Sequence, residues 1–317
     1  MNNAHHAPTV VVLGSVHMDL IASAARMPGR GESVGEGVFA MSAGGKAGNQ
    51  ACQFVLAGAY AHVITRLGKD AFGETLLDDL TRRGVDTVLV AQDPTTPTGA
   101  STVFAVEGDY SSIIAPGAAA RLSEADVDAA RGTIQLADAL VLQLELPAAI
   151  SAHAAGIAAA AGKTVILNAS PAPEGLSAIP QALRDATSVL VVNRVEAGRL
   201  LGRDVGAAVA EADLADLATR FGAGTVVVTL GKEGVVALGG DGFVRQAAFP
   251  AEVVDAVGAG DAFLGTFATA LLEGLTLAEA LRRGAAAGAL AVSRRGVYDA
   301  LPSREEVDHF LAGQTPR

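Results

Sequence analysis

Aromatic side chains are scarce in this sequence. Tryptophan is absent, and phenylalanine and tyrosine make up only 4% of the 317 residues. Half of the residues are nevertheless apolar, so the core has to be packed mainly from alanine, valine and leucine. Small aliphatic side chains of this kind suit helices that lie on a parallel β-sheet. The length allows one large α/β domain or two small ones.

Cysteine is nearly absent as well. Cys52 is the only one, which excludes an internal disulfide and a cysteine-rich zinc site and fits a reducing compartment. The longest apolar runs fall short of the roughly 20 residues that span a bilayer. Residues 1–8 lack the basic and apolar regions of a signal peptide, so we expect a frayed terminus there. These absences predict a cytoplasmic protein with no membrane partner.

Positive charge is also in short supply. The chain has 23 lysines and arginines against 34 aspartates and glutamates, a formal net charge of -11. Such a field repels a polyanion, and no basic run offsets it, so a nucleic-acid partner is excluded. A charged small substrate would need a local cation such as Lys46.

What the sequence does contain is a regular alternation of strand-like and helix-like segments. Several of the strands are followed by a polar residue, as Glu145 follows one of them. The expected strands are 9–13, 63–64, 85–90, 139–144, 164–167, 188–192 and 225–229, and the expected helices are 49–56, 73–83, 123–134, 147–161 and 262–272. Helices of ordinary length between strands predict a parallel sheet with right-handed crossovers.

The chain shows no internal repeat, low-complexity linker or break in composition, so we expect residues 1–317 to form one unit. Two segments do not fit the alternation. Residues 26–43 are rich in glycine with weak alternation, and residues 101–114 have the pattern of a hairpin. We expect these pieces to pair with each other as a small β appendage.

A glycine-rich turn at residues 258–261 precedes a helix-like run. Gly258 and Gly260 lack a Cβ, so the backbone can approach a ligand and present its N–H groups. At a helix N-terminus such groups favour an anion, and the carboxylate of Asp261 would then accept a proton from an attacking hydroxyl. The alternative is a tight turn in which Asp261 is the helix N-cap.

A second glycine pair, Gly44-Gly45, is followed by Lys46 and Asn49 at the start of another expected helix. This arrangement is a further place where backbone N–H groups and polar side chains can meet a ligand. Asp19 lies just beyond the first strand, where ligands gather in open α/β sheets. The plainer interpretation is a loop whose glycines relieve steric strain, with Asp19 as a solvated turn residue.

Other catalytic motifs are missing. Gly162-Lys163-Thr164 resembles the end of a phosphate-binding P-loop, but Gly156 lies one residue too far away and the order of helix and strand is inverted. Gly162 instead has the position of a helix C-cap. No dinucleotide-binding glycine motif follows the first strand, and the six histidines show no metal-binding spacing.

Taken in order, the polar motifs resemble those of the ribokinase-like (PfkB) sugar kinases. These motifs are Gly14-Ser15 with Asp19; Gly44-Gly45-Lys46 with Asn49-Gln50-Ala51; Glu145; Asn193 with Glu196; Thr229-Leu230-Gly231; and Asp255 with Gly258-Ala259-Gly260-Asp261. The resemblance implies a three-layer α/β/α fold with a mostly parallel central sheet. It also implies a small β-sheet lid, formed by residues 15–43 and 98–115, that closes over the sugar and often makes a dimer contact.

The resemblance also implies a role for each matching residue. The sugar hydroxyls would be held by Asp19, Gly45, Lys46, Asn49 and Glu145. The nucleotide would be lined by Asn193, Thr229, Gly231 and Gly234, with Glu196 ordering magnesium through water. Asp261 would be the base, beside an anion hole built from Gly258, Ala259 and Gly260. Potassium would bind the backbone oxygens of Asp255, Val257, Ala291, Arg294 and Gly296.

The sequence departs from the family pattern at a few positions. His17 stands where a sugar-contacting asparagine is expected; its imidazole either reshapes the pocket, meets an anionic substrate group, or donates the same hydrogen bond. Ala47-Gly48 reverses the usual glycine-alanine order. Ala285 replaces a histidine near the adenine, and Ala300 replaces a serine near the potassium ion.

These motifs lead to the hypothesis of an ATP-dependent kinase that phosphorylates the primary hydroxyl of a small sugar, with ribose as the first candidate. The transition state of phosphoryl transfer is loose, so positioning and charge stabilisation by magnesium and backbone N–H groups carry most of the catalysis. A nucleoside kinase on the same fold is the enzymatic alternative. A catalytically inactive sugar-binding sensor is the alternative from a different class.

Overall fold

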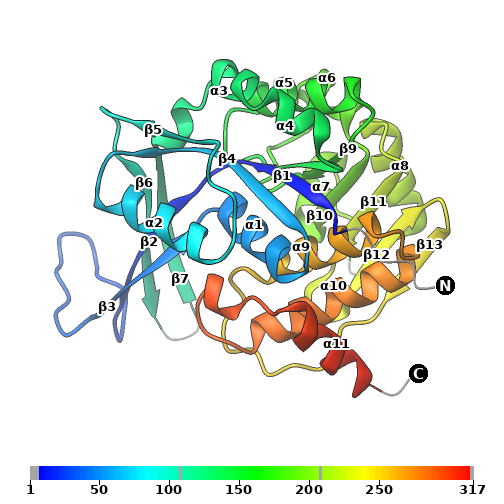
Figure 1. Cartoon of the computed structure of the whole chain (residues 1–317). Helices are drawn as coiled ribbons and strands as arrows, with labels where there is room; N and C mark the ends of the chain where they lie inside the picture. Colours follow the sequence, from blue (N-terminus) through cyan, green and yellow to red (C-terminus); the bar gives the residue numbers. More distant parts are fainter. Residues whose placement is uncertain (1–6, 107–108, 207–208, 315–317) are drawn as a thin grey trace.

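The computed structural model describes residues 7–106, 109–206 and 209–314. Within them, the larger of two β-sheets has nine strands (Figure 1). From one edge to the other they are β13 (Gly242–Gln246), β12 (Val235–Gly239), β11 (Thr225–Thr229), β10 (Val189–Asn193), β9 (Thr164–Asn168), β8 (Ala139–Leu142), β1 (Thr9–Leu13), β4 (Tyr60–Gly68) and β5 (Val90–Asp93). The strands from β11 to β5 pair in parallel, and the pairs β11–β12 and β12–β13 are antiparallel, so β12 alone runs against the other strands of this sheet.

Successive residues of β1 face opposite sides of this sheet, as the period of a strand requires. Val10 and Val12 belong to one apolar core, and Val11 and Leu13 to the other. The first core is covered by α1 (Lys46–Leu56), α2 (Ala71–Arg82), α9 (Ala259–Leu272), α10 (Leu277–Val292) and α11 (Arg304–Ala312). The second is covered by α3 (Glu124–Ala129), α4 (Arg131–Leu136), α5 (Ala148–Ala160), α6 (Gln181–Ala186), α7 (Arg194–Leu201) and α8 (Glu211–Phe221). The predicted three-layer α/β/α fold is confirmed.

The early β segments form a separate small sheet, with strands in the order β3-β2-β6-β7. Its strands are β3 (Val38–Gly44), β2 (His17–Ser23), β6 (Thr98–Val106) and β7 (Asp109–Gly117). β2 pairs with β3 antiparallel and with β6 parallel. The two expected pieces therefore belong to one sheet, but they do not pair with each other as expected, because β2 lies outside both and stands between them. The small sheet lies at one side of the molecule, next to α2 (Figure 1). Residues 107–108 of the expected hairpin and residues 1–6 of the expected frayed terminus lie outside the described residues.

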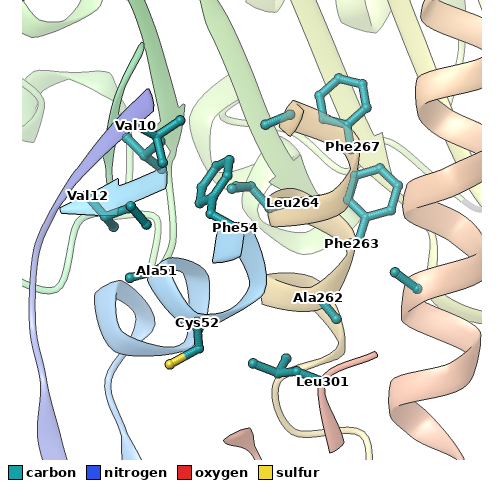
Figure 2. Packing of buried hydrophobic residues seen from close by; sticks show 14 of the residues in the cluster. Val10, Val12, Ala51, Cys52, Phe54, Ala262, Phe263, Leu264, Phe267 and Leu301 are labelled. Atoms are coloured by element: carbon teal, nitrogen blue, oxygen red, sulfur yellow. The ribbon is translucent and has the colours of Figure 1, made fainter. Parts of the chain in front are cut away.

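Helices α1 and α9 pack closely in the first core. Figure 2 shows Phe54 of α1 among the buried side chains with Leu264 and Phe267 of α9. The helices approach most closely at Gly265, where a Cβ would lie only 2.7 Å from the Cβ of Gln53. Because any larger side chain would push the helices apart, glycine at position 265 allows α1 and α9 to pack this closely.

Two expected elements are wrong. The expected strand at 85–90 is mostly a turn, because the backbone N–H of Val88 donates to Asp86 Oδ1 at 2.9 Å and closes a local turn; β5 begins only at Val90. The expected helix at 123–134 is interrupted at Ala130, which separates α3 from α4. The backbone N–H of Ala130 donates to the carbonyl of Val127, three residues back, at 3.0 Å. The antiparallel strands β12 and β13 were not among the expected elements.

The remaining expected helices are present with shifted ends. Gly162, expected as a helix C-cap, follows α5 with a φ of 69°, the left-handed conformation that glycine adopts readily. No helix of the described residues has both the length and the apolar character needed to cross a membrane.

Candidate active site

Asp261 lies in the first turn of α9, three residues beyond the helix N-cap. The N-cap is Gly258, with a φ of 79°, so the alternative interpretation of Asp261 as the N-cap is wrong. The side chain of Asp261 points into the protein and is 6% exposed. A buried carboxylate requires hydrogen-bond donors, and those donors come from α1.

Each carboxylate oxygen of Asp261 accepts one amide hydrogen bond. Asn49 Nδ2 donates to Oδ2 at 2.7 Å, and Gln50 Nε2 donates to Oδ1 at 2.8 Å. These bonds join residues more than 210 positions apart in the sequence. The carbonyl oxygen of the Asn49 side chain has no hydrogen-bond partner among the described residues, so it is available as an acceptor for a ligand hydroxyl.

The backbone of the same turn is accessible. Gly260 is exposed, and a Cβ placed on it would meet no heavy atom within 4 Å. The first N–H groups of a helix have no partner within the helix, and they lie at the positive end of its dipole. The backbone N–H of Ala259 donates to the carbonyl of Ala256 at a long distance of 3.4 Å. The first turn of α9 therefore combines a buried carboxylate with exposed backbone at Gly260.

Glu145 follows β8 and contacts the start of α1. Its Oε2 atom accepts a hydrogen bond from the hydroxyl of Ser15 and one from the backbone N–H of Lys46, the latter at 3.0 Å. Gly45, the N-cap of α1, has a φ of 90°, and a Cβ there would lie 2.5 Å from the backbone oxygen of Ser15. The glycine at position 45 is thus required by the close approach of two loops.

His17 and Asp19 lie on β2 of the small sheet. His17 Nε2 is 3.3 Å from Asp19 Oδ1, and both side chains are largely buried. The carboxylate of Asp19 lies over Gly44, whose missing Cβ would be 2.3 Å from Asp19 Oδ2. The imidazole at position 17 therefore faces a carboxylate of its own strand.

Asn193 and Glu196 form the start of α7. The backbone N–H of Glu196 donates to Asn193 Oδ1 at 2.9 Å, and that of Asn193 donates to Glu196 Oε2 at 2.8 Å, which makes a reciprocal capping box. The neighbouring strand places Thr229 directly opposite Asn193. Glu196 is mostly buried, and the cap uses its Oε2 atom and not its Oε1 atom.

The two glycines expected near the nucleotide differ in their surroundings. Gly231 has a φ of 59° and no heavy atom within 4 Å of an added Cβ, so it borders open space. An added Cβ on Gly234 would lie 2.1 Å from the backbone oxygen of Gln246 on β13. Packing of the β12–β13 hairpin alone accounts for glycine at position 234.

The segments expected to bind potassium lie side by side. The backbone N–H groups of Val254 and Asp255 donate to the carbonyl of Val292 at 2.8 and 3.1 Å, just after Ala291 at the end of α10. Asp255 Oδ1 accepts from the backbone N–H of Val257. The other expected residues, Arg294 and Gly296, follow α10 directly, and Ala300 is buried. Ala291 belongs to the last turn of α10, and its carbonyl accepts a hydrogen bond from the backbone N–H of Arg294 at 3.1 Å. The structure therefore brings the two segments together, while the carbonyl of Ala291 already has a partner.

Three polar residues around Asp261 have no role in the sequence-based prediction. Gln143 Nε2 donates to Gln50 Oε1 at 2.7 Å, and Gln50 Nε2 also donates to Asn168 Oδ1 at 3.1 Å. Asn168 ends β9, and Gln143 follows β8. Polar residues at the carboxyl ends of parallel strands were a usable signal, because these ends share one edge of the sheet.

Comparison with known proteins agrees with this geometry. Residues 7–304 match the model of the pfkB family carbohydrate kinases. A ribokinase from Haemophilus influenzae is 32% identical over 305 residues, which cover 96% of this chain and 98% of the relative. A deoxyribokinase from Salmonella typhi is 29% identical over 304 residues, covering 96% of this chain and 98% of the relative.

A solved structure is similar over the same extent. The ribokinase of Arabidopsis thaliana, complexed with ribose and ATP, has a TM-score of 0.87 and 30% sequence identity, covering 98% of this chain and 100% of the other. The family model spans nearly the whole chain, and a ribokinase more than 30% identical does so too. The chain therefore belongs to the pfkB family of carbohydrate kinases.

Proposed function

We propose that this protein transfers the γ-phosphoryl group of ATP to the primary hydroxyl of a small sugar, with ribose as the first candidate. The observation that carries the proposal is the first turn of α9. There the carboxylate of Asp261 is fixed by Asn49 and Gln50, next to the exposed backbone at Gly260. A proton acceptor beside an open anion-binding turn is what phosphoryl transfer to a hydroxyl requires.

In the proposed mechanism, Asp261 accepts the proton of the attacking hydroxyl. Each of its oxygens holds one amide donor and keeps a further lone pair for that proton. The backbone N–H groups of Ala259, Gly260 and Asp261 stabilise negative charge on the group in transfer, because they belong to the open first turn of α9. Gly258 allows the turn through its positive φ.

The proposed sugar site lies between Asp261 and the small sheet. Asp19, Gly45, Lys46, Asn49 and Glu145 would hold the hydroxyls, with His17 at the margin of the site. The unpartnered Asn49 Oδ1 supports this placement, since a buried acceptor without a donor is costly until a ligand supplies one. One similar structure contains ribose, while another relative is named a deoxyribokinase, so the sugar itself is the open part of the proposal.

The proposed nucleotide site lies at the ends of β10 and β11. Asn193, Thr229, Gly231 and Gly234 would border it, and the open surroundings of Gly231 support a ligand there more than those of Gly234 do. Glu196 would hold magnesium through water. When bound there, magnesium would supply positive charge that neutralises the charge developing on the phosphate oxygens.

A monovalent cation, potassium, is proposed beside the anion turn. Its ligands would be backbone oxygens of Asp255, Val257, Ala291, Arg294 and Gly296 on the two adjoining segments. Through its charge and through Asp255, it would steady the segment that leads into Gly258. We further propose a cytoplasmic location, where ATP is available and where the buried thiol of Cys52, whose pKa burial raises to about 12, stays reduced.

We also propose that residues 1–317 act as one kinase domain, with the small sheet as a lid and as the contact of a homodimer. The small sheet exposes large apolar side chains, although exposed apolar patches of this kind are uncommon on monomers. They are Val38, Phe39 and Met41 on β3, Phe104 on β6, and Ile113 and Ile114 on β7. The strand register places Phe39, Met41, Phe104 and Ile113 on one face of the sheet and Val38 and Ile114 on the other. A second copy of the sheet would cover the first of these faces.

A coupled assay of ADP release tests the reaction. The panel contains pentoses, 2-deoxypentoses, hexoses, acidic sugars and nucleosides, each with and without potassium. A pentose should give the highest kcat/KM, and Asp261→Asn should lower kcat by about 100-fold or more while nucleotide affinity is retained. Near wild-type turnover of Asp261→Asn would contradict the role of this residue, and a nucleoside as the best substrate would contradict the sugar.

A further inference from the structure

A continuous chain of side-chain amides leads from the central sheet to Asp261. Gln143, after β8, donates to Gln50 on α1, and Gln50 donates to Asp261 Oδ1. Gln50 is 0% exposed and Gln143 is 2% exposed. Gln50 lies behind the carboxylate, bonded to its Oδ1 atom, whereas Asn49 holds Oδ2. Gln50 therefore contacts the proposed base from inside the protein.

Which end of each side-chain amide is the oxygen and which is the NH2 group follows from groups at the ends of the series that can only accept hydrogen bonds. The backbone oxygen of Val191 can only accept, and Asn168 Nδ2 donates to it at 3.1 Å. Asn168 must then turn its oxygen towards Gln50, which has to present its NH2 group there and to Asp261. This leaves Gln50 Oε1 facing Gln143, which supplies the donor that it needs.

This series of amide hydrogen bonds leaves one buried acceptor without a partner in the described part of the chain. Gln143 Oε1 is buried without a hydrogen-bond partner among the described residues. Gln143 Oε1 lies close to Gly14: if position 14 carried a Cβ, that atom would be only 2.0 Å from the oxygen. A buried unpartnered oxygen destabilises the fold, so an apolar side chain at position 143 would serve stability better. What a glutamine at position 143 provides is its Nε2 donor, which hydrogen-bonds to Gln50 Oε1.

We propose that Gln50 is a positioning residue for Asp261, and that Gln143 acts on catalysis only through Gln50. This inference rests on the proposed function, in which Asp261 is the base. Two amides on the two carboxylate oxygens, from adjacent residues of one buried helix, fix both the position and the plane of the carboxylate. Without Gln50 the carboxylate can rotate about its remaining bond to Asn49, and the proton-accepting oxygen leaves its productive position.

The experiment compares Gln50→Met, Gln143→Met and the double variant, because methionine has a similar volume and cannot donate. We expect Gln50→Met to lower kcat by about 10- to 100-fold, the scale of a misplaced catalytic group, with the sugar KM changed less than about 3-fold. Gln143→Met should lower kcat by a smaller factor. In the double variant kcat should equal that of Gln50→Met, because Gln143 has then lost the residue through which it acts.

Gln53 provides the matched control. It is equally buried on the same helix, but its Nε2 atom donates to Thr266 Oγ1 and to the backbone oxygen of Pro302, away from Asp261. Methionine keeps the Cβ and Cγ atoms with which Gln53 packs against Gly265 and removes only the amide. Gln53→Met should therefore lower the thermal midpoint and leave kcat within about twofold of the wild type, as expected for a purely structural contact. Thermal unfolding of every variant separates loss of folded protein from loss of turnover.

The possible outcomes are distinct. If folded Gln50→Met keeps wild-type kcat, or if the double variant loses the product of the two single effects, the positioning role is overturned. If Gln143→Met is too unstable to assay, Gln50→Met against Gln53→Met decides the first half of the proposal. Asp261→Asn is measured alongside. If it keeps near wild-type turnover, the proposal that Asp261 is the base is contradicted. If only Gln50→Met keeps normal turnover, the positioning role of Gln50 alone is contradicted.

Discussion

The hydroxyl oxygen of Tyr298 occupies the space that a Cβ on Gly48 would fill, only 1.9 Å from the Cβ position. Tyr298 is buried, its hydroxyl has no hydrogen-bond partner among the described residues, and burial raises its pKa well above the ordinary value. The guanidinium of Arg83 lies 5.2 Å from the centre of the ring. This contact explains the reversed order of Ala47 and Gly48, since only glycine leaves room for the hydroxyl.

Gly48→Ala is expected to destabilise the protein by about 1–3 kcal/mol, the usual cost of overpacking a core. Adding Tyr298→Phe should recover most of the lost stability, because it removes the hydroxyl oxygen that clashes with the new Cβ. That hydroxyl has no hydrogen-bond partner among the described residues, so its removal breaks no hydrogen bond. Denaturant unfolding of the two single variants and the double variant measures this coupling. Gly156→Ala on α5, where an added Cβ meets nothing within 4 Å, is the control and should stabilise by up to about 1 kcal/mol. Equal effects at Gly48 with and without Tyr298→Phe would disprove the steric explanation.

Acid should weaken the fold through Asp93 at the end of β5. Backbone N–H groups, chiefly that of Thr95 and then that of Thr96, together with the Arg66 guanidinium, hold the pKa of this carboxyl well below its ordinary 3.8. The carboxylate therefore contributes stability that is complete above about pH 4 and is lost as the pH falls below the unfolded value. The difference in unfolding free energy between wild type and Asp93→Asn should shrink from pH 6 towards pH 2. A gap that stays constant over this range would show that the charge of Asp93 contributes nothing.

His17 is expected to tune affinity for a neutral sugar. Any positive charge on its imidazole would be balanced by Asp19 Oδ1 at 3.3 Å, which leaves little charge for an anionic substrate. His17→Asn should therefore change the sugar KM by several-fold and kcat by less than about twofold, as for a group that contacts the ground state and transition state alike. Steady-state kinetics with ribose and an acidic sugar measures both. A wild-type preference for the acidic sugar that disappears in His17→Asn would refute this view.

The exposed apolar side chains of the small sheet should control the oligomeric state. Phe39→Ser and Ile113→Ser remove large side chains that are 64% and 72% exposed and that a partner would cover. We expect these variants to shift a dimer towards monomer in sedimentation equilibrium, because apolar burial drives association. Leu136→Ser, at the end of α4 and 83% exposed, is the control and should leave the dimer intact. A wild-type chain that sediments as a monomer at micromolar concentration would contradict the proposal directly.

The larger sheet could be read from the sequence wherever its strands are buried on both faces. The expected segments at 9–13, 164–167, 188–192 and 225–229 agree with β1, β9, β10 and β11 to within one residue at either end. Periodicity failed where a local hydrogen bond competes with the pattern, as Asp86 does in the turn before β5. It also failed at β12 and β13, which pair only with each other and with one edge of the parallel sheet.

The site was predictable as a set of motifs but not as a set of contacts. Glycines and a carboxylate at a helix start identify the turn at Asp261 without any structure. Its bonds to Asn49 and Gln50 depend on α1 and α9 packing at Gly265, and no local pattern encodes the distance between two helices so far apart in the chain. Gln143 and Asn168 look like ordinary polar residues at strand ends until the sheet brings them to the same edge as Gln50.

The ten residues from Asp261 to Ala270 on α9 are all buried, whereas His17 and Asp19 belong to a different sheet. The carboxylate of Asp261 is thus anchored in a continuous buried stretch of helix, whereas the β2 residues of the candidate sugar site are held by the pairing of a separate sheet. Met18 and Leu20 of β2 contact the same apolar core as α1 and α9, so only substitutions that spare these two residues leave the α1–α9 packing unchanged. Under the proposed function, substitutions at His17 or Asp19 could then change the accepted sugar while the hydrogen bonds around Asp261 stay as they are.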